Sequence, residues 1–308
     1  IYQGWRLINS RALRYGKDRG PQPGARYRML RLGFENYVQT LVGIHNSPHA
    51  GKLVSATLLP AAATAAFGFA HALIGMIRRY LPAQLLLGLI EPVIMARYSE
   101  RGDFAQASHL GGIVLKLNLF VLAPLMAWMG IDGDLLIDWI SDGKYGRDAW
   151  MVAVLLVWLI LENDWLVLKM LANAVEVSGK LVRATLWTWL LVPPVLAGVF
   201  ALGAPALVAG ALIFAFSRNV LLVRSLTRSG YIHRMDLRGN LLIAGNAVLA
   251  TLVATRLTSE MEPVLLRILA SLTLTATLYL LFSWLIKPFR PAERETINRF
   301  IGRKLFVW

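Results

Sequence analysis

Residues 149–170 read AWMVAVLLVWLILENDWLVLKM, and this run decides the class of the fold. A helix needs about 20 apolar residues to cross the ~30 Å hydrocarbon core of a bilayer, and this run meets that length. The whole chain agrees, because 56% of its 308 residues are hydrophobic and 16% are charged, whereas soluble domains carry about 25% charged residues. The sequence therefore predicts an all-α, polytopic membrane protein.

Further apolar runs lie on both sides of this span. They predict spans at residues 110–130, 183–201, 204–226, 239–256 and 263–286. Residues 62–97 form one longer run that contains Pro82 and Pro92, which predicts a kinked or tilted helix. Distortions of the third and fifth spans are likewise predicted at Pro124 and at Pro193 and Pro194,. Residues 35–58 are interrupted by polar residues, and we count them as the first of about eight transmembrane helices.

The basic residues test this count. The chain has 32 Lys and Arg against 18 Asp and Glu, a formal net charge of +14, and Lys and Arg gather in cytoplasmic loops. With eight spans, most bases fall on one side of the membrane, in segments 1–34, 97–109, 169–183, 224–238 and 287–308. The loops on the other side hold Lys144, Arg147, Arg256 and Arg267. We therefore expect both ends of the chain to be cytoplasmic.

The charge pattern also divides the chain into three parts. Residues 1–33 read as a basic cytoplasmic linker or amphipathic segment, 34–286 as the transmembrane helical domain, and 287–308 as a basic cytoplasmic amphipathic tail. Both basic ends suit contact with membrane lipids. Because topology explains these charges and no recognition motif accompanies them, we expect no nucleic-acid partner.

Charges inside the spans are the candidates for function, because an ionisable group at membrane depth faces a protein interior or a water-filled cavity. Arg78 and Arg79 lie near the middle of the 62–97 run. Since Arg binds phosphate oxygens in a bidentate manner, we predict an anionic headgroup site there, with Lys52 and Lys116 as secondary ligands. The alternative is a structural ion pair with an acid on a neighbouring span.

Glu162 and Asp164 are the acids placed well inside an apolar span. Two residues of separation turn them about 200° apart on a helix, which argues against a pair of catalytic carboxylates. We assign them to ion coupling or charge balance, with structural pairing to Arg78, Arg79 or Lys116 as the alternative. Lys116 and Arg218 lie in the predicted cytoplasmic thirds of their spans, so we expect both to snorkel.

The first span carries a polar stretch. His45, His49 and Lys52 follow at i, i+4 and i+7, so on a continuous helix they share one face, which would form a hydrophilic cavity wall. The alternative is a break where the helix is unwound. A His-x3-His pair without a third ligand, in a chain with no cysteine, gives no expected metal site or cofactor.

The sequence lacks the common enzyme motifs that were considered. The chain has no Walker A loop, no His-Glu-x-x-His and no Gly-x-Ser-x-Gly,. Asp132 and Asp134 have the acid-x-acid spacing of a metal–nucleotide site, but the topology puts them on the outer side. We therefore expect a protein that is not an enzyme and has no catalytic residues.

Several stretches occur in a characteristic order. They are GFAHAL at 68–73, EPVI at 91–94, SERGDFAQA at 99–107 and LIDWISDGKY at 136–145. In this order and spacing the chain resembles the C-terminal half of polysaccharide flippases, the O-antigen, exopolysaccharide and lipid-linked oligosaccharide carriers of the multidrug/oligosaccharidyl-lipid/polysaccharide exporter superfamily.

The resemblance implies a fold of fourteen spans in two lobes plus two helices, of which this chain would supply spans seven to fourteen. It implies alternating access around a basic cavity, moving a polyprenyl-pyrophosphate-linked oligosaccharide across the inner membrane of a bacterium. The expected partners are this lipid-linked oligosaccharide, the missing N-terminal lobe, and polysaccharide polymerase or other assembly proteins. A C-terminal fragment, or assembly from two half-size chains, would account for the absent lobe.

Three alternatives stay open. A drug or metabolite exporter of the same superfamily would favour acids over a doubly basic centre. A membrane-embedded transferase of polysaccharide assembly would need acids or histidines clustered at one interface. A scaffold that transports nothing would have all its buried charges paired with one another.

Overall fold

The computed structural model of the chain is helical. It describes residues 25–85, 88, 91–92, 98, 102–233, 235–301, 304 and 306–308, so most of the predicted linker 1–33 lies outside the described residues. The elements are α2 (Ala25–Val42), η1 (Gly43–Asn46), α3 (Pro48–Leu58), α4 (Ala61–Arg78), α6 (Phe104–Ile131), α7 (Gly133–Ile140), η2 (Gly146–Asp148), α8 (Ala149–Ala174), α9 (Gly179–Thr188), η3 (Trp189–Leu191), α10 (Val192–Leu202), α11 (Ala204–Thr227), α12 (Leu237–Thr258), α13 (Val264–Ile286) and α14 (Pro291–Ile301).

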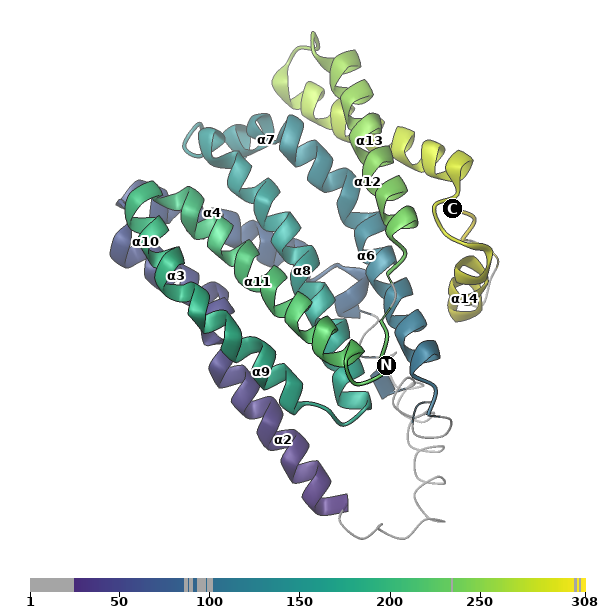
Figure 1. The fold of residues 1–308 in the computed structure, drawn as a ribbon. Coiled ribbons are helices and arrows are strands. Elements are labelled where there is room, and N and C mark those ends of the chain that lie inside the picture. Colours follow the sequence, from purple (N-terminus) through teal and green to yellow (C-terminus); the bar gives the residue numbers. More distant parts are fainter. Residues whose placement is uncertain are drawn as a thin grey trace, which may run out of the picture.

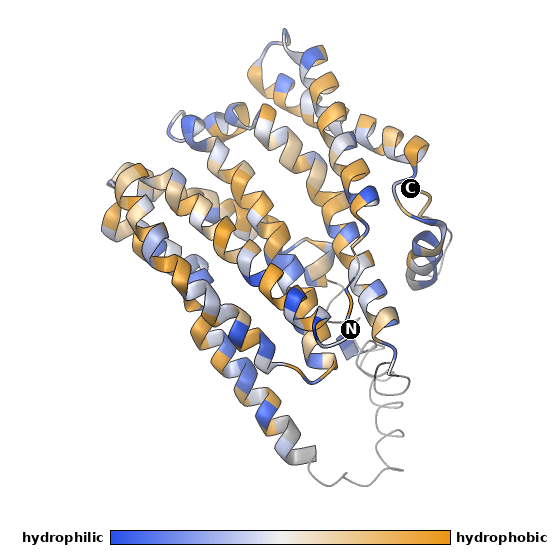
Figure 2. Ribbon diagram, viewed as in Figure 1, coloured by the Kyte–Doolittle hydropathy of each residue, from blue (hydrophilic) through white to orange (hydrophobic). Residues whose placement is uncertain are grey.

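Seven helices in the described part of the chain are long and apolar enough to cross a membrane. They cover Ala61–Arg78, Phe104–Ile131, Gly146–Ala174, Gly179–Leu202, Ala204–Thr227, Leu237–Thr258 and Val264–Ile286. The prediction of an all-α polytopic membrane protein is therefore confirmed, and its exposed apolar helix faces contact membrane lipid. Figure 2 shows these helices mostly orange, with more blue on α2 and α14.

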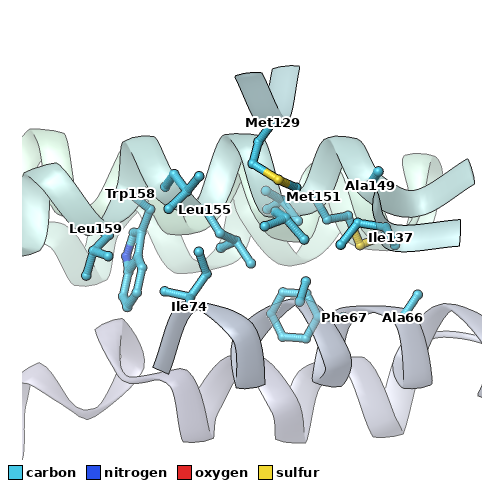
Figure 3. Close-up of a cluster of buried hydrophobic side chains, with 14 of the residues drawn as sticks. Ala66, Phe67, Ile74, Met129, Ile137, Ala149, Met151, Leu155, Trp158 and Leu159 are labelled. Carbon is cyan, nitrogen blue, oxygen red and sulfur yellow. The ribbon is translucent and has the colours of Figure 1, made fainter. Parts of the chain in front are cut away.

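Helices α6 and α8 pack against each other at the centre of the bundle (Figure 1). The α12–α13 hairpin packs on α6, whereas α4 and α11 pack on α8. The largest core cluster lies where α4 meets α8 (Figure 3): Phe67 and Ile74 of α4 face Met151, Leu155 and Trp158 of α8. Apolar side chains at helical spacing on both partners fix this contact.

The first predicted span is not one continuous helix. Helix α2 passes into the 3₁₀ turn η1, and Ser47 is extended, with ψ 150°, before α3 begins at Pro48. A residue that precedes proline is driven out of the α region, and the Ser47 hydroxyl caps α3 by accepting a hydrogen bond from the Ala50 N–H at 3.2 Å,. The unwound break given as the alternative for this stretch is therefore confirmed.

The run 62–97 does not form a single kinked helix, and that prediction is wrong. Helix α4 ends at Arg78, a turn follows at residues 79–80, and helical structure resumes at Pro82. Proline has no N–H to donate and is favoured in a first helical turn. Pro82 therefore starts a new helix where we expected a bend in an existing one.

The predicted distortion at Pro193 and Pro194 is confirmed. The 3₁₀ turn η3 separates α9 from α10, and both prolines lie in the first turn of α10. The first four N–H groups of a helix have no acceptor within the helix, so the N–H groups that these two prolines lack cost no helical hydrogen bond. The span is thereby built from two short helices.

Pro124 is accommodated within α6, which runs without a break from Phe104 to Ile131. A proline cannot donate to the carbonyl four residues earlier, here that of Phe120. The buried hydroxyl of Tyr279 on α13 donates to this oxygen at 2.9 Å. The proline thus creates an acceptor that ties α13 to α6.

We expect Tyr279→Phe to lower the free energy of unfolding by about 1 kcal/mol, because a buried carbonyl loses its partner. Thermal unfolding in detergent measures the loss. A double variant that also carries Pro124→Ala restores the N–H donor within α6, so the cost of losing the hydroxyl should shrink in that background. An equal cost in both backgrounds would contradict this account of Pro124.

The tail after α13 folds back on the bundle. Lys287 ends α13 in the left-handed conformation, with φ 53°,, and α14 follows. Phe289 and Ile297 are buried with Tyr279 and Phe120, and Phe306 and Trp308 pack on the same cluster. The last described residues therefore belong to the packed structure.

Candidate functional site

The break after α4 lies about half-way along the two central helices. The Ala83 N–H donates to Oδ1 of Asn118 at 3.4 Å, and Gln84 Nε2 donates to Oδ1 of Asn163 at 3.5 Å. Asn118 and Asn163 are buried near the midpoints of α6 and α8. These contacts fix the depth at which the chain leaves the helical path.

Arg78 and Arg79 lie at this break, Arg78 as the last residue of α4 and Arg79 as its C-cap. Arg78 is half-buried and Arg79 is exposed. Within the described residues neither forms an ion pair. A charge exposed at this depth costs several kcal/mol if it faces lipid. The position therefore suits a water-filled cavity or the surface of another protein unit.

The face of α4 that leads to Arg79 is made mostly of small residues, with Met76 as the large exposed side chain on it. Their positions follow helical spacing: Ala61, Ala65, Gly68, Ala72 and Gly75,. A Cβ built on Gly68 or Gly75 meets nothing within 4 Å. This face is therefore a shallow surface that ends in a cationic group.

The polar residues of the first span are separated by the break. His49 and Lys52 are exposed on α3, whereas His45 lies in η1 and turns into the bundle. His45 contacts the Thr188 hydroxyl at 2.8 Å and the Val42 carbonyl at 3.0 Å. The three side chains thus do not share the single face that a continuous helix would give.

His45 also lines a small pocket of about 100 Å³ together with Asn46 and His71. The remaining lining is mostly apolar, from α4, α8, α10 and α11. Both polar atoms of the Asn46 side chain are buried and have no hydrogen-bond partner in the described part of the chain. A polar pocket of this size has room for ordered water.

Glu162 pairs with a residue that sequence reasoning did not select as its partner. Its Oε1 lies 2.7 Å from Nη2 of Arg218 on α11, and Arg218 is 3% exposed. The guanidinium carbon also lies 4.1 Å from the ring centroid of Trp165,. Arg218 is thus held inside the bundle, and the expectation that it snorkels is wrong.

Lys116 is the centre of a second buried ion cluster. Its amine lies 2.5 Å from Asp236 Oδ2 and 2.7 Å from Glu293 Oε2, and its side chain is 2% exposed. Arg290 pairs with the other oxygen of Asp236 at 2.9 Å. Gly239 leaves the space that the amine occupies, since a Cβ there would overlap it. Lys116 therefore does not snorkel either, which corrects the sequence prediction.

The surroundings of Asp236 hold this group ionised at the N-cap of α12. Burial alone would raise its pKa, but the Lys116 hydrogen bond, the Gly239 N–H and the nearby charge of Arg290 outweigh burial and lower the pKa,. Asp236 therefore remains a carboxylate well below neutral pH. The cluster is a charge-balanced link between α6, α12 and α14.

Asp164 lies on the other side of α8 from Glu162, as their spacing predicts. It lines a cavity of about 810 Å³ that Lys116, Asp236 and Glu293 also line. The structure thus brings Asp164 and Lys116 to one cavity. It places Glu162 in a separate ion pair, and it leaves Arg78 and Arg79 at the α4 break.

Sequence reasoning missed the role of Asp132. The residue is buried, accepts hydrogen bonds from Thr255 at 2.8 Å and Ser271 at 2.9 Å, and lies 3.6 Å from Arg267. It joins α6 to α12 and α13, where an exposed outer loop was expected. In the described part of the chain no three His, Cys, Asp or Glu residues gather as metal ligands.

Comparison of the chain with protein family models, with curated proteins and with solved structures finds no match.

Proposed function

We propose that this chain forms one lobe of a transporter that carries a polyprenyl-pyrophosphate-linked oligosaccharide across the inner membrane of a bacterium. The observation that carries the proposal is the pair Arg78 and Arg79 at a helix break half-way along α6 and α8. Arg79 is exposed at a depth where lipid would be a costly neighbour,. A central aqueous cavity that receives an anionic headgroup gives this charge a favourable environment.

The chemistry of the site fits a pyrophosphate. Arginine stays charged at every physiological pH and binds phosphate oxygens with paired N–H donors. The small-residue face of α4 leaves room for a large ligand beside the cation, and Lys52 of α3 is a further exposed cation. In this proposal the lipid tail stays in the bilayer while the headgroup crosses.

Transport would proceed by alternating access between this lobe and a second, N-terminal lobe. Both ends of the chain would be cytoplasmic, and the partners would include polysaccharide polymerase or other assembly proteins. The protein would bind and move its substrate without chemical change. Asp164, in the cavity beside Lys116, is then the better candidate for ion coupling, because Glu162 already balances Arg218.

The buried charges separate this proposal from a scaffold that transports nothing. A scaffold would have its intramembrane charges mutually paired. Lys116, Arg218 and Glu162 meet that condition, whereas Arg78, Arg79 and Asp164 form no ion pair with any described residue. A doubly basic centre also argues against a drug exporter that selects cations.

The test is complementation in cells that lack this gene. Deletion should cause lipid-linked oligosaccharide to accumulate on the inner leaflet, and the native protein should clear it. Arg78→Gln with Arg79→Gln should reduce clearance at least tenfold, given about 1.5–3 kcal/mol for each lost hydrogen bond to a charged group. The matched control is Arg224→Gln with Arg228→Gln, two exposed arginines near the end of α11, which should clear normally. Full clearance by the Arg78/Arg79 variant at native expression would overturn the headgroup assignment.

A further inference from the structure

A basic groove lies between the end of α13 and α14. These two elements are at the right of Figure 1. Its volume is about 860 Å³. It is lined by Trp284, Lys287, Pro291, Arg294, Glu295, Asn298, Arg299, Lys304, Phe306 and Val307. This groove is separate from the α4 break and from the cavity beside Asp164.

The groove has fixed walls. Asn298 holds the returning tail by two hydrogen bonds to the backbone of Phe306, one donated to its carbonyl at 2.9 Å and one accepted from its N–H at 2.8 Å. Trp308 Nε1 donates to the Leu280 carbonyl at 3.2 Å. Phe306 packs edge-on against Phe289 with ring centroids 4.9 Å apart. The tail is thus attached to both helices that form the groove.

Among the described residues, the lining carries four cations against a single acid. Glu295 is already paired with Arg299 at 2.5 Å, while Lys287 and Lys304 are exposed. Arg294 is half-buried, and its Nε atom is buried with no hydrogen-bond partner among the described residues. An anion in this groove would therefore meet several cationic donors at once.

One side of the groove continues into the surface that faces lipid. Trp284 is 52% exposed and Leu285 is 62% exposed on the last turn of α13. Tryptophan is enriched at the level of lipid headgroups. An anion bound here would have apolar side chains directly next to it. The acyl chains of a phospholipid need such apolar surroundings next to the bound phosphate, whereas a free phosphate has no use for them.

We propose that this groove binds the phosphodiester headgroup of an anionic phospholipid, with the acyl chains lying along the exposed face of α13. Basic pockets beside transmembrane helices on the predicted cytoplasmic side suit such headgroups. This site would be occupied by a lipid that is not transported, so it does not depend on the proposed function.

The test uses the purified full chain in mild detergent and measures binding of a short-chain phosphatidylglycerol. Phosphatidylcholine is the zwitterionic control, and inorganic phosphate is tested as a competitor. The groove variant is Lys287→Gln, Arg299→Gln and Lys304→Gln, which alters exposed side chains alone. The matched control is Arg183→Gln, Arg224→Gln and Arg228→Gln, three exposed arginines on α9 and at the end of α11. None of the three lines the groove.

Native protein should bind phosphatidylglycerol more tightly than phosphatidylcholine. The groove variant should weaken binding about 100-fold, since each cation near anionic lipid contributes about fivefold, whereas the control variant should stay within about threefold of native protein. If the groove variant and the control variant lose the same affinity for phosphatidylglycerol, the lipid is attracted by the overall positive charge and not bound at a site. That result would overturn the proposal. Competition by inorganic phosphate at the same concentration as the lipid would identify a free-anion site and would also overturn it.

Discussion

Replacing Lys116 by Met is expected to lower the free energy of unfolding by about 3–5 kcal/mol, because removal of one partner leaves a buried charge uncompensated. The Lys116 amine contacts Asp236 and Glu293 at hydrogen-bonding distance and is almost fully buried. Without it two carboxylates face each other, and Arg290 reaches one of them. Methionine keeps the volume and length of the side chain, so the loss reports on charge.

Two measurements separate this effect from general damage. Thermal unfolding in detergent gives the loss of stability, and limited proteolysis reports whether the segment after Lys287 comes away from the bundle. Adding Asp236→Asn and Glu293→Gln to Lys116→Met should recover much of the loss, since the buried groups are then neutral and the remaining charge, on Arg290, is exposed to water,. If the triple variant is no more stable than Lys116→Met alone, the ion cluster is not the source of the effect.

Replacing Arg218 by Leu should have a comparable effect, about 3–5 kcal/mol, because Glu162, whose side chain is 15% exposed, would be left within the membrane span without its partner,. The guanidinium also packs over Trp165, and this contact adds about 0.5–2 kcal/mol when it is shielded from water,. Chemical or thermal unfolding of the purified chain measures the sum. The large loss follows from the depth of the pair, since both residues lie near the middle of their helices.

A double variant separates the contribution of the Arg218–Glu162 ion pair from the contributions of the two side chains taken singly. Arg218→Leu with Glu162→Leu removes both charges and should be more stable than Arg218→Leu alone, since apolar residues replace a buried pair at little cost. Arg224→Leu, an exposed position on the same helix, is the matched control and should change stability little. A double variant as unstable as the single one would contradict a charge-based explanation.

The helices themselves could be predicted from the sequence. Runs such as 149–170 and 263–286 consist mainly of apolar residues. Because each is long enough to cross a bilayer, both are predicted to be transmembrane helices. Proline explains where prediction succeeded and where it failed. Pro193 and Pro194 mark a real distortion, whereas Pro124 lies in an unbroken helix. In α6 the carbonyl that Pro124 leaves without its helical donor accepts a hydrogen bond from the Tyr279 hydroxyl, which is distant in sequence.

The candidate site was less accessible to sequence reasoning, because ion pairing is a property of the packed bundle. Arg218 lies 56 residues from Glu162, and Lys116 lies 120 residues from Asp236. Hydropathy shows that Arg218, Glu162 and Lys116 are charges within apolar spans, but it does not show which charges pair with one another. Asp132 is one of several acids in the segment 131–148 and could not be told apart from exposed loop acids by sequence. Its hydrogen-bond partners Thr255 and Ser271 are distant in sequence and belong to no motif.

The Lys116 cluster also sets an order of events during synthesis. Glu293 follows Lys116 by 177 residues, so a ribosome adding about 5–20 residues per second needs on the order of ten seconds or more to supply it. During that interval the lysine has left the ribosome without its full set of counter-charges. Chains that end before Asp236 therefore carry this base within a membrane helix without either of its two carboxylate partners.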